Sequence, residues 1–129
     1  MENSNVRVRD RIAQLIRTRK YIAVICHERW GGSFFSRSGS SAFIARKLAT
    51  PEWIGKNIRK ALYTSEDFSV KHENFIPSEN NYTEATRECA YKCHAFWLKV
   101  AEEFNFKDTK AAKSKSALVF IHWSSDKTD

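Results

Sequence analysis

Glycine is scarce in this sequence, and its few glycines do not form a phosphate-binding loop. The four glycines are Gly31, Gly32, Gly39 and Gly55. None belongs to a G-x-G-x-x-G pattern or to a glycine-rich stretch that ends in G-K-[ST]. Both patterns present backbone N–H groups to phosphates, so their absence argues against nucleotide-driven chemistry.

Long apolar runs are also lacking, above all near the N-terminus. Arginines interrupt the stretch "MENSNVRVRDRIAQLIRTRK", which has neither the apolar core of a secretory signal nor the length of a membrane span. Glu2 and Asp10, together with the scarcity of Ser and Ala, argue against an organelle transit peptide. We expect a cytoplasmic protein that is not attached to a membrane.

Cysteines are few and odd in number: Cys26, Cys89 and Cys93. A secreted disulfide scaffold normally has an even number of cysteines in a shorter chain. Reduced thiols in a reducing compartment are therefore expected.

The composition is that of a soluble globular domain with a basic charge balance. At 129 residues, 42% of them hydrophobic and 29% charged, the chain is long enough for one domain with its own core. The net charge of +7 predicts attraction to nucleic acid or to an acidic protein surface. The basic residues cluster in residues 1–20 and again at Lys107–Lys115, and the sequence does not show whether the two clusters share a face.

Hydrophobic spacing in the first half of the chain predicts a helix followed by strands. Apolar residues at helical spacing predict a basic N-terminal helix within residues 1–19: Val8, Ile12, Leu15 and Ile16. The nearly continuous apolar run Tyr21–Glu28 predicts a central strand. Gly31-Gly32 predicts a hairpin turn into a returning strand, and "SAFIARKL" predicts a third short strand.

The second half predicts two helices and a closing strand. Thr50 as N-cap, Pro51 at the first helical position and Glu52 in the first turn predict the start of one helix. After a polar connection at 64–81, a longer helix is expected from an N-cap at Thr83 to about Asn105. A strand at 117–123 precedes a polar tail at 124–129.

These elements predict a single α+β domain over residues 1–129, with its core at 20–123. Because strands and helices are interspersed without strict βαβ alternation, we expect a mixed sheet with two or three packed helices.

Metal binding and catalysis are both weakly supported by the residues. Cys89 and Cys93 lie one helical turn apart in an apolar stripe with His94 pointing elsewhere, so a core role is favoured over zinc ligation, even with help from Cys26 and His27. A Cys26 thiolate inside a strand would be desolvated, which disfavours a Cys-His nucleophile. We therefore expect no metal, no cofactor and no catalytic residue.

Two other functions remain open on these residues. His27 and His122 sit at the ends of the two best strands and could act as general acid and base in a small nuclease, if the strand ends meet. Basic residues interleaved with aromatics, as in "RTRKYIAVICHERW", would suit a small nucleic-acid-binding protein.

The order of elements resembles the small immunity proteins of bacterial contact-dependent growth inhibition (CDI) systems. In one such family a capped helix carries the pattern x-x-I-G-x-x-[IV]-x-x-A-L, which "EWIGKNIRKAL" fits through Ile54, Gly55, Ile58, Ala61 and Leu62. "FNFK" at Phe104–Lys107, followed by Lys110 and Lys113, approximates a [YF]-x-[YF]-K-[TS] turn and a lysine-rich approach to the closing strand. The resemblance covers roughly residues 20–123 by order of elements.

The resemblance implies a non-enzymatic inhibitor that binds the toxic C-terminal domain of a delivered effector, often a nuclease. Small basic nucleic-acid binding is the alternative. Because nuclease toxins are commonly basic, a local acidic surface would have to supply charge complementarity in a chain of net charge +7. The candidate partner-binding residues are the tryptophan beside the glycine turn and the acidic residues of the polar connection, namely Trp30, Glu66, Asp67, Glu73 and Glu79.

Overall fold

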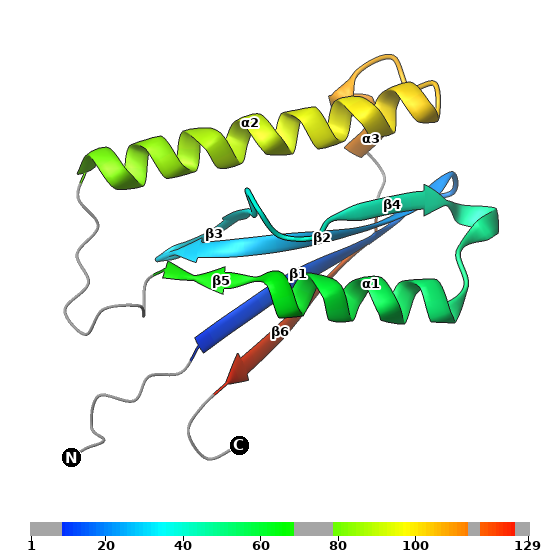
Figure 1. Cartoon of the computed structure of the whole chain (residues 1–129). Helices are drawn as coiled ribbons and strands as arrows, with labels where there is room; N and C mark the ends of the chain where they lie inside the picture. Colours follow the sequence, from blue (N-terminus) through cyan, green and yellow to red (C-terminus); the bar gives the residue numbers. More distant parts are fainter. Residues whose placement is uncertain (1–8, 69–78, 114–116, 126–129) are drawn as a thin grey trace.

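The computed structural model describes residues 9–68, 79–113 and 117–125 (Figure 1). In chain order the elements are β1 (Arg9–Arg17), β2 (Tyr21–Trp30), β3 (Gly32–Phe35), β4 (Ala42–Ala45), the 3-10 helix η2 (Arg46–Leu48), α1 (Pro51–Thr64), β5 (Glu66–Asp67), α2 (Glu79–Glu103), α3 (Thr109–Lys113) and β6 (Ala117–Ser125). The six strands form one sheet, and helices pack on it. The predicted α+β class is confirmed.

Strand β2 is the centre of the sheet. Along one edge it pairs antiparallel with β1, which pairs in turn with β6. Along the other edge it pairs antiparallel with β4 over Tyr21–Val24 and with β3 over His27–Trp30. Strand β5 pairs in parallel with Glu28 and Arg29, so the sheet is mixed, as predicted.

Strand β5 occupies a place where β1 and β2 separate. The last register pair of β1 and β2 at this end is Ala13 with Cys26. Beyond it, the Ser65 hydroxyl just before β5 donates a hydrogen bond to the His27 carbonyl (2.6 Å) and accepts one from the Ile12 N–H (3.1 Å). Backbone groups that lose their partner in the neighbouring strand are therefore bonded again through β5 and the residue before it.

The N-terminal segment is a strand, and the expected basic helix is wrong for the residues that the structure describes. Residues 1–8 lie outside the described ranges, but Arg9–Arg17 pair with β2 on one side and with β6 on the other. Leu15 packs against the cluster beneath α1, while Ile16 belongs to the cluster beneath α2. A strand covered on both faces carries apolar residues without alternation, and this pattern imitated the spacing of a helix.

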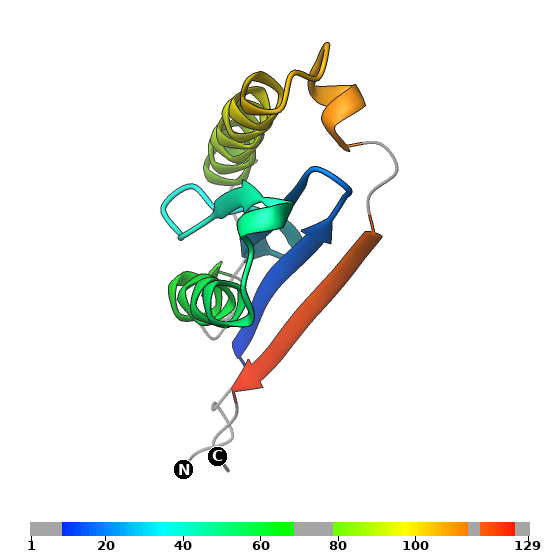
Figure 2. The ribbon, with the colours of Figure 1, turned by 90° about the vertical axis from the view of Figure 1, so that its right-hand side faces the viewer.

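The sheet has a helix on each face, and Figures 1 and 2 show α2 and α1 on opposite sides of β2. Alternate residues of β2 point to opposite faces. One face packs Tyr21 and Ile25 against Trp97 and Val100 of α2. The other packs Val24 and Cys26 with Ala61 of α1. In Figure 2, β6 lies at the edge of the sheet away from α1.

Helix α1 begins as its sequence predicts. The Thr50 hydroxyl accepts a hydrogen bond from the Trp53 N–H at 3.0 Å, Pro51 is the first helical residue and Glu52 lies in the first turn. The missing N–H of Pro51 removes a donor that would have no helical partner, and the Glu52 carboxylate favours the positive end of the helix dipole. The helix buries Ala61 against the sheet.

Helix α2 ends where expected but begins earlier. It starts at Glu79, so Thr83 lies inside the helix and its predicted N-cap role is wrong. The first turn is polar, and apolar periodicity therefore appears only after the helix has begun. At the other end, Asn105 has φ 59°, and the Phe106 N–H donates to the Ala101 carbonyl at 2.8 Å, which is the bonding of a Schellman motif.

Two further elements close the described chain. The short helix α3 was not expected, because its five residues carry too little periodicity to be recognised. Strand β6 was expected over residues 117–123 and continues to Ser125. Within the described ranges, no helix has both the length and the apolar composition needed to cross a bilayer.

Candidate functional site

The β2–β3 hairpin carries a network of polar contacts, and a single glycine makes its turn. Trp30 pairs with Gly32 across the hairpin, so Gly31 alone connects the two strands. Gly31 has φ 84°, a backbone conformation that residues with a Cβ rarely adopt. The predicted glycine turn is confirmed.

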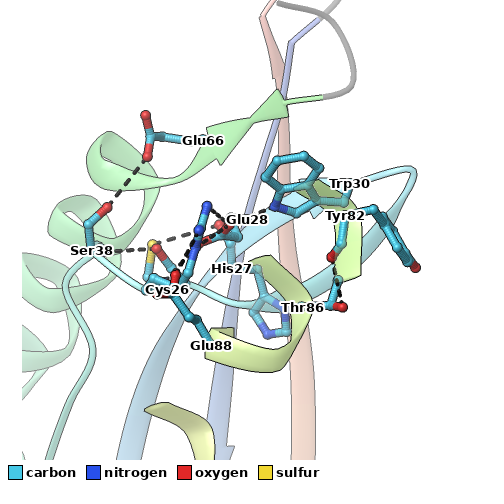
Figure 3. Close-up of polar contacts among 12 residues, drawn as sticks. Cys26, His27, Glu28, Trp30, Ser38, Glu66, Tyr82, Thr86 and Glu88 are labelled. Carbon is cyan, nitrogen blue, oxygen red and sulfur yellow. Dashed lines mark hydrogen bonds and ion pairs between the residues drawn. The ribbon is translucent and has the colours of Figure 1, made fainter. Parts of the chain in front are cut away.

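The carboxylate of Glu28 organises the hairpin end (Figure 3). Its side chain is 1% exposed. One oxygen accepts a hydrogen bond from Trp30 Nε1 at 2.7 Å, and the other accepts one from the Arg37 backbone N–H at 2.8 Å. The Arg37 guanidinium adds contacts to Glu28 from Nε (3.0 Å) and Nη2 (2.8 Å). The buried Glu28 carboxylate is thus paired with the Arg37 guanidinium and accepts two further hydrogen bonds, from Trp30 Nε1 and from the Arg37 backbone N–H.

Arg37 links this buried carboxylate to α2 and to two aromatic rings. Its Nη1 lies 3.1 Å from the Glu88 carboxylate, while its guanidinium carbon is 5.7 Å from the Trp30 ring centre and 5.6 Å from that of Phe68. The hydrogen bond to Glu28 is the largest cause of the raised pKa of Arg37. Trp30 and Phe68 stack with centroids 4.6 Å apart. The cation therefore holds the β2–β3 hairpin, the residue after β5 and α2 together.

An open depression of about 320 Å³ lies over this network. Its described lining residues are Trp30, Arg37, Glu84, Ala85 and Glu88, among which Arg37 is the sole cation and is already paired with Glu28. Glu84 is exposed, and the Glu88 side chain is 67% exposed. We use the term acidic hairpin surface for Trp30, Glu66, Tyr82, Glu84 and Glu88, of which Trp30, Glu84 and Glu88 line the depression.

The structure places the sequence-derived candidates in different environments. Trp30 is half-buried, and its N–H is bonded to Glu28. Glu66 is half-buried and accepts a long hydrogen bond of 3.4 Å from the Ser38 hydroxyl. Glu79 is the first residue of α2, although its side chain lies outside the description, and Glu73 lies outside the described residues altogether.

Asp67 is buried, and its carboxylate makes contacts within the protein. Its side chain is 2% exposed, and Arg29 Nε lies 3.8 Å from its carboxylate. The same carboxylate accepts a hydrogen bond from the Asp10 N–H at 3.0 Å. Asp67 therefore attaches β5 to the first strand from inside the protein.

The two strand-end histidines contact different side chains of β1. His27 Nε2 lies 3.2 Å from the Gln14 side-chain oxygen, and burial lowers the pKa of His27. His122 Nε2 lies 3.0 Å from the Asp10 carboxylate. His27 also lines a cavity of about 250 Å³ under α2, with Cys93 and Lys113 among its other lining residues. The two rings are thus held by different side chains of β1, Gln14 for His27 and Asp10 for His122, and the acid–base pairing considered from the sequence stays a prediction.

The cysteines lie in the core or at its margin. Burial raises the pKa of the Cys26 and Cys93 thiols and raises that of Cys89 to about 12. Cys26 Sγ donates to the Ala61 carbonyl at 3.1 Å. Thiols held in this protonated form are poor nucleophiles and poor metal ligands. In the described part of the chain, His, Cys, Asp and Glu side chains do not gather into a group of metal-binding size.

Sequence reasoning missed Glu28, Arg37 and Glu88 as members of one site. Glu28 ends the predicted strand Tyr21–Glu28, whereas Arg37 and Glu88 lie in segments far from one another in the sequence. The sequence does contain one signal of this site: Glu28 places a carboxylate at the end of an apolar strand, two residues before Trp30. Its partners could not be identified before the hairpin register and the place of α2 were known.

Comparison with known proteins gives a family and a fold. A family model described as "CdiI: CDI immunity protein" matches residues 11–128. The sequence has no significant match among curated proteins. Among solved structures, a protein of unknown function from Neisseria meningitidis is similar with a TM-score of 0.66 and 14% identity, covering 88% of this chain and 65% of that one. A CdiA-CT/CdiI toxin and immunity complex from Yersinia pseudotuberculosis is similar with a TM-score of 0.67 and 12% identity, covering 88% of this chain and 68% of that one. This chain thus spans about two-thirds of the length of each, and at these identities the likeness is one of fold.

Proposed function

The chain belongs to the CDI immunity protein family, and from that premise we propose that it binds and neutralises the toxic C-terminal domain of a CDI effector. The protein acts by occupying a surface of the toxin and contributes no catalytic group of its own. We place this activity in the cytoplasm, where the free thiols of Cys26, Cys89 and Cys93 would stay reduced.

The observation that carries the proposed mode of binding is the acidic hairpin surface. Glu84 and Glu88 project from the start of α2 beside the half-buried Trp30 ring, on a scaffold fixed by the Glu28–Arg37 pair. An acidic surface complements a basic partner, which is the charge expected of a domain that handles nucleic acid. We therefore propose that the toxin is a nuclease and that its basic substrate-binding surface faces this patch.

The residues proposed for toxin binding differ in their roles. Trp30 supplies a rigid aromatic contact, and Glu66 and Glu84 supply charge. Asp67 acts indirectly, because its buried carboxylate holds β5 and thereby positions Glu66. Glu73 and Glu79, expected from the sequence to extend the same acidic surface, remain part of the proposal.

The test is neutralisation of the effector's toxin domain in living cells, combined with calorimetry of the purified pair. Co-expression of this chain should restore growth to cells that produce the toxin domain. The double substitution Glu66→Lys and Glu84→Lys should weaken binding by about tenfold or more, equivalent to about 1.4 kcal/mol.

The matched control is Glu102→Lys with Glu103→Lys, at exposed positions near the other end of α2. It makes the same change in net charge, so nonspecific attraction changes equally in both variants. If both variants bind alike, the acidic hairpin surface is not the contact. If the unaltered chain neither binds the toxin domain nor restores growth, the immunity function itself is wrong.

A further inference from the structure

Three distant segments meet at the end of the molecule that holds the β1–β2 turn, and two of them carry basic residues. The turn contributes Arg19 and Lys20, η2 contributes Arg46 and Lys47, and the segment after α2 contributes Phe104. With Ala45, these residues line an open groove of about 380 Å³. We call the set Arg19, Lys20, Arg46 and Lys47 the basic pole. Figure 1 shows the β1–β2 turn, η2 and the C-terminal part of α2 at the same end of the molecule.

Hydrogen bonds hold these segments to one another. The Arg46 N–H donates to the Lys20 carbonyl at 2.8 Å, and Arg46 Nη1 donates to the Thr18 carbonyl at 2.8 Å. Lys20 Nζ donates to the Phe104 carbonyl at 3.3 Å and lies 4.9 Å from the centre of the Phe106 ring. The backbone positions of the pole are thus fixed before any ligand arrives, which reduces the entropy lost on binding.

The charges of the pole are available to an anion. All four cationic side chains are exposed, and in the described part of the chain no carboxylate forms an ion pair with any of them. Arg29 and Arg37, by contrast, are matched with acidic groups around β5 and the hairpin. The acidic residues that flank Phe104 in the sequence are Glu102, Glu103 and Asp108. Asp108 caps α3, because its carboxylate accepts a hydrogen bond from the Ala111 N–H at 2.8 Å.

Four of the six residues that line the groove end in a cationic group, and this concentration of positive charge favours a phosphate chain over a protein partner. Stable protein interfaces place apolar anchors at their centre. Among the described residues near the pole, Leu48 at 60% exposed is the one large apolar side chain that stands free, while Phe104 is packed against Tyr21 at 5.6 Å. Arginine and lysine side chains on a fixed backbone are the usual ligands of phosphate oxygens.

We propose that the basic pole binds the phosphate backbone of a nucleic acid, at a site separate from the acidic hairpin surface. Arg19 and Lys47, whose side chains form no hydrogen bond or ion pair with the residues that the structure describes, contact phosphates directly. Lys20 and Arg46 both shape the groove and add charge. Lys107, which follows Phe106, extends the contact beyond the groove.

The test is fluorescence anisotropy with a labelled oligouridine of about 12 nucleotides, a length that can span one such site. Affinity should fall as salt rises. The double substitution Arg19→Glu and Lys47→Glu should weaken binding by about tenfold or more and reduce the slope of log K against log salt by about 1.4, the value for two lost phosphate contacts on a single strand. The milder pair Arg19→Gln and Lys47→Gln should lie between this variant and the unaltered protein.

The matched control is Lys56→Glu with Lys60→Glu, two exposed lysines of α1 that make the same change in net charge. The proposal is overturned if the two double variants bind RNA alike, if binding does not depend on salt, or if polyglutamate of equal charge competes as well as RNA. Salt-sensitive self-association in sedimentation, with no RNA binding, would instead assign the pole to a second copy and also overturn it.

RNA binding at the basic pole and neutralisation of the toxin should be lost independently of each other. The Arg19→Glu, Lys47→Glu variant should still restore growth to cells that make the toxin domain, because the altered residues lie at the basic pole and outside the acidic hairpin surface. Loss of neutralisation with RNA binding intact would count against the proposed function, whereas loss of RNA binding with neutralisation intact supports a separate site.

Discussion

Glu28 shows how one side chain can join several segments. Its carboxylate contacts a tryptophan in its own strand and an arginine in the loop after β3, and that arginine reaches α2. A carboxylate removed from water is tolerated when each oxygen is bonded to a charged or polar donor. Here both oxygens meet that condition.

Replacing Glu28 with Gln should destabilise the protein by about 1.5–3 kcal/mol, the range for hydrogen bonds to charged groups. The amide removes the negative charge and leaves the Arg37 guanidinium without its main partner. Urea unfolding followed by fluorescence measures the change. Glu84→Gln, at an exposed position beside the same depression, should stay within about 0.5 kcal/mol. Equal effects of the two substitutions would contradict the structural role of Glu28.

His27 should make the protein less stable as the solution is acidified through the ordinary histidine range. Burial lowers the pKa of His27 in the folded state, so below pH 6.5 the unfolded chain takes up a proton that the folded chain resists. This difference favours the unfolded state, so the free energy of unfolding should fall as the pH drops from 6.5 towards 5.5.

The measurement is the free energy of unfolding at a series of pH values for the unaltered protein and for His27→Gln. The variant should lose less stability than the unaltered protein over this interval. His94→Gln, at an exposed position on α2, is the control and should follow the unaltered protein. An unchanged pH dependence in His27→Gln would show that another group is responsible.

At the scale of elements, the separation of β1 and β2 is the feature that admits β5. The Ser65 hydroxyl bonds to both strands, through the Ile12 N–H and the His27 carbonyl. The next contact along is the Asp67 carboxylate, which accepts the Asp10 N–H. A two-residue strand is therefore held by side chains as well as by its pairing with β2.

Removing the Ser65 hydroxyl should loosen this junction. Ser65→Ala leaves the Ile12 N–H and the His27 carbonyl without that partner in a poorly hydrated place, and should cost about 1–3 kcal/mol of unfolding free energy. Amide hydrogen exchange at Ile12 should accelerate more than at Leu15, which pairs within the intact part of the sheet.

Ser38→Ala is the control, because Ser38 is exposed and its contact with Glu66 is long, at 3.4 Å. Its effect should stay within about 0.5 kcal/mol. If Ser65→Ala also falls within that limit, the hydroxyl does not hold the junction.

Local signals predicted the elements whose cause is local. The cap at Thr50, the turn at Gly31 and the apolar run of β2 each depend on adjacent residues, and the structure confirms them. Strand β1 pairs with β2 across a short turn and with β6 more than 100 residues later, since Arg9 pairs with Ser125. Because both of its faces are covered, its apolar residues do not alternate, and residues 9–17 alone carry no local mark that separates them from an amphipathic helix.

The candidate surfaces were predictable only in part, for the same reason. The sequence indicated Trp30 and the nearby acids as a partner surface, but the buried role of Asp67 follows from its contacts with Asp10 and Arg29. The two basic clusters of the sequence could not be placed on one face from their spacing. Packing of the α2 C-terminus against the β1–β2 turn brings Lys20 to Phe104 and Phe106, so the end of the first cluster lies near the start of the second, while Arg9 and Arg11 lie toward the other end of β1.

At the scale of the whole molecule, the two proposed binding surfaces lie at opposite ends. The exposed acids Glu84 and Glu88 lie at the hairpin end, while the basic pole lies at the end where β1 turns into β2. A net charge of +7 therefore hides an uneven distribution. Such a molecule presents different potentials to partners that approach from opposite ends, which steers them as they diffuse.

The pairing of β1 with β6 has a consequence for the order of folding. Strands β1, β2, β3 and β4 are connected by short turns and can form their ladders early, whereas the β1–β6 ladder closes a loop that contains nearly every other element. Closing so long a loop is slow and comes late, after the intervening chain has become compact. During synthesis on the ribosome, the edge of β1 that pairs with β6 therefore stays unpaired until β6 emerges. A chaperone could bind this exposed edge in that interval.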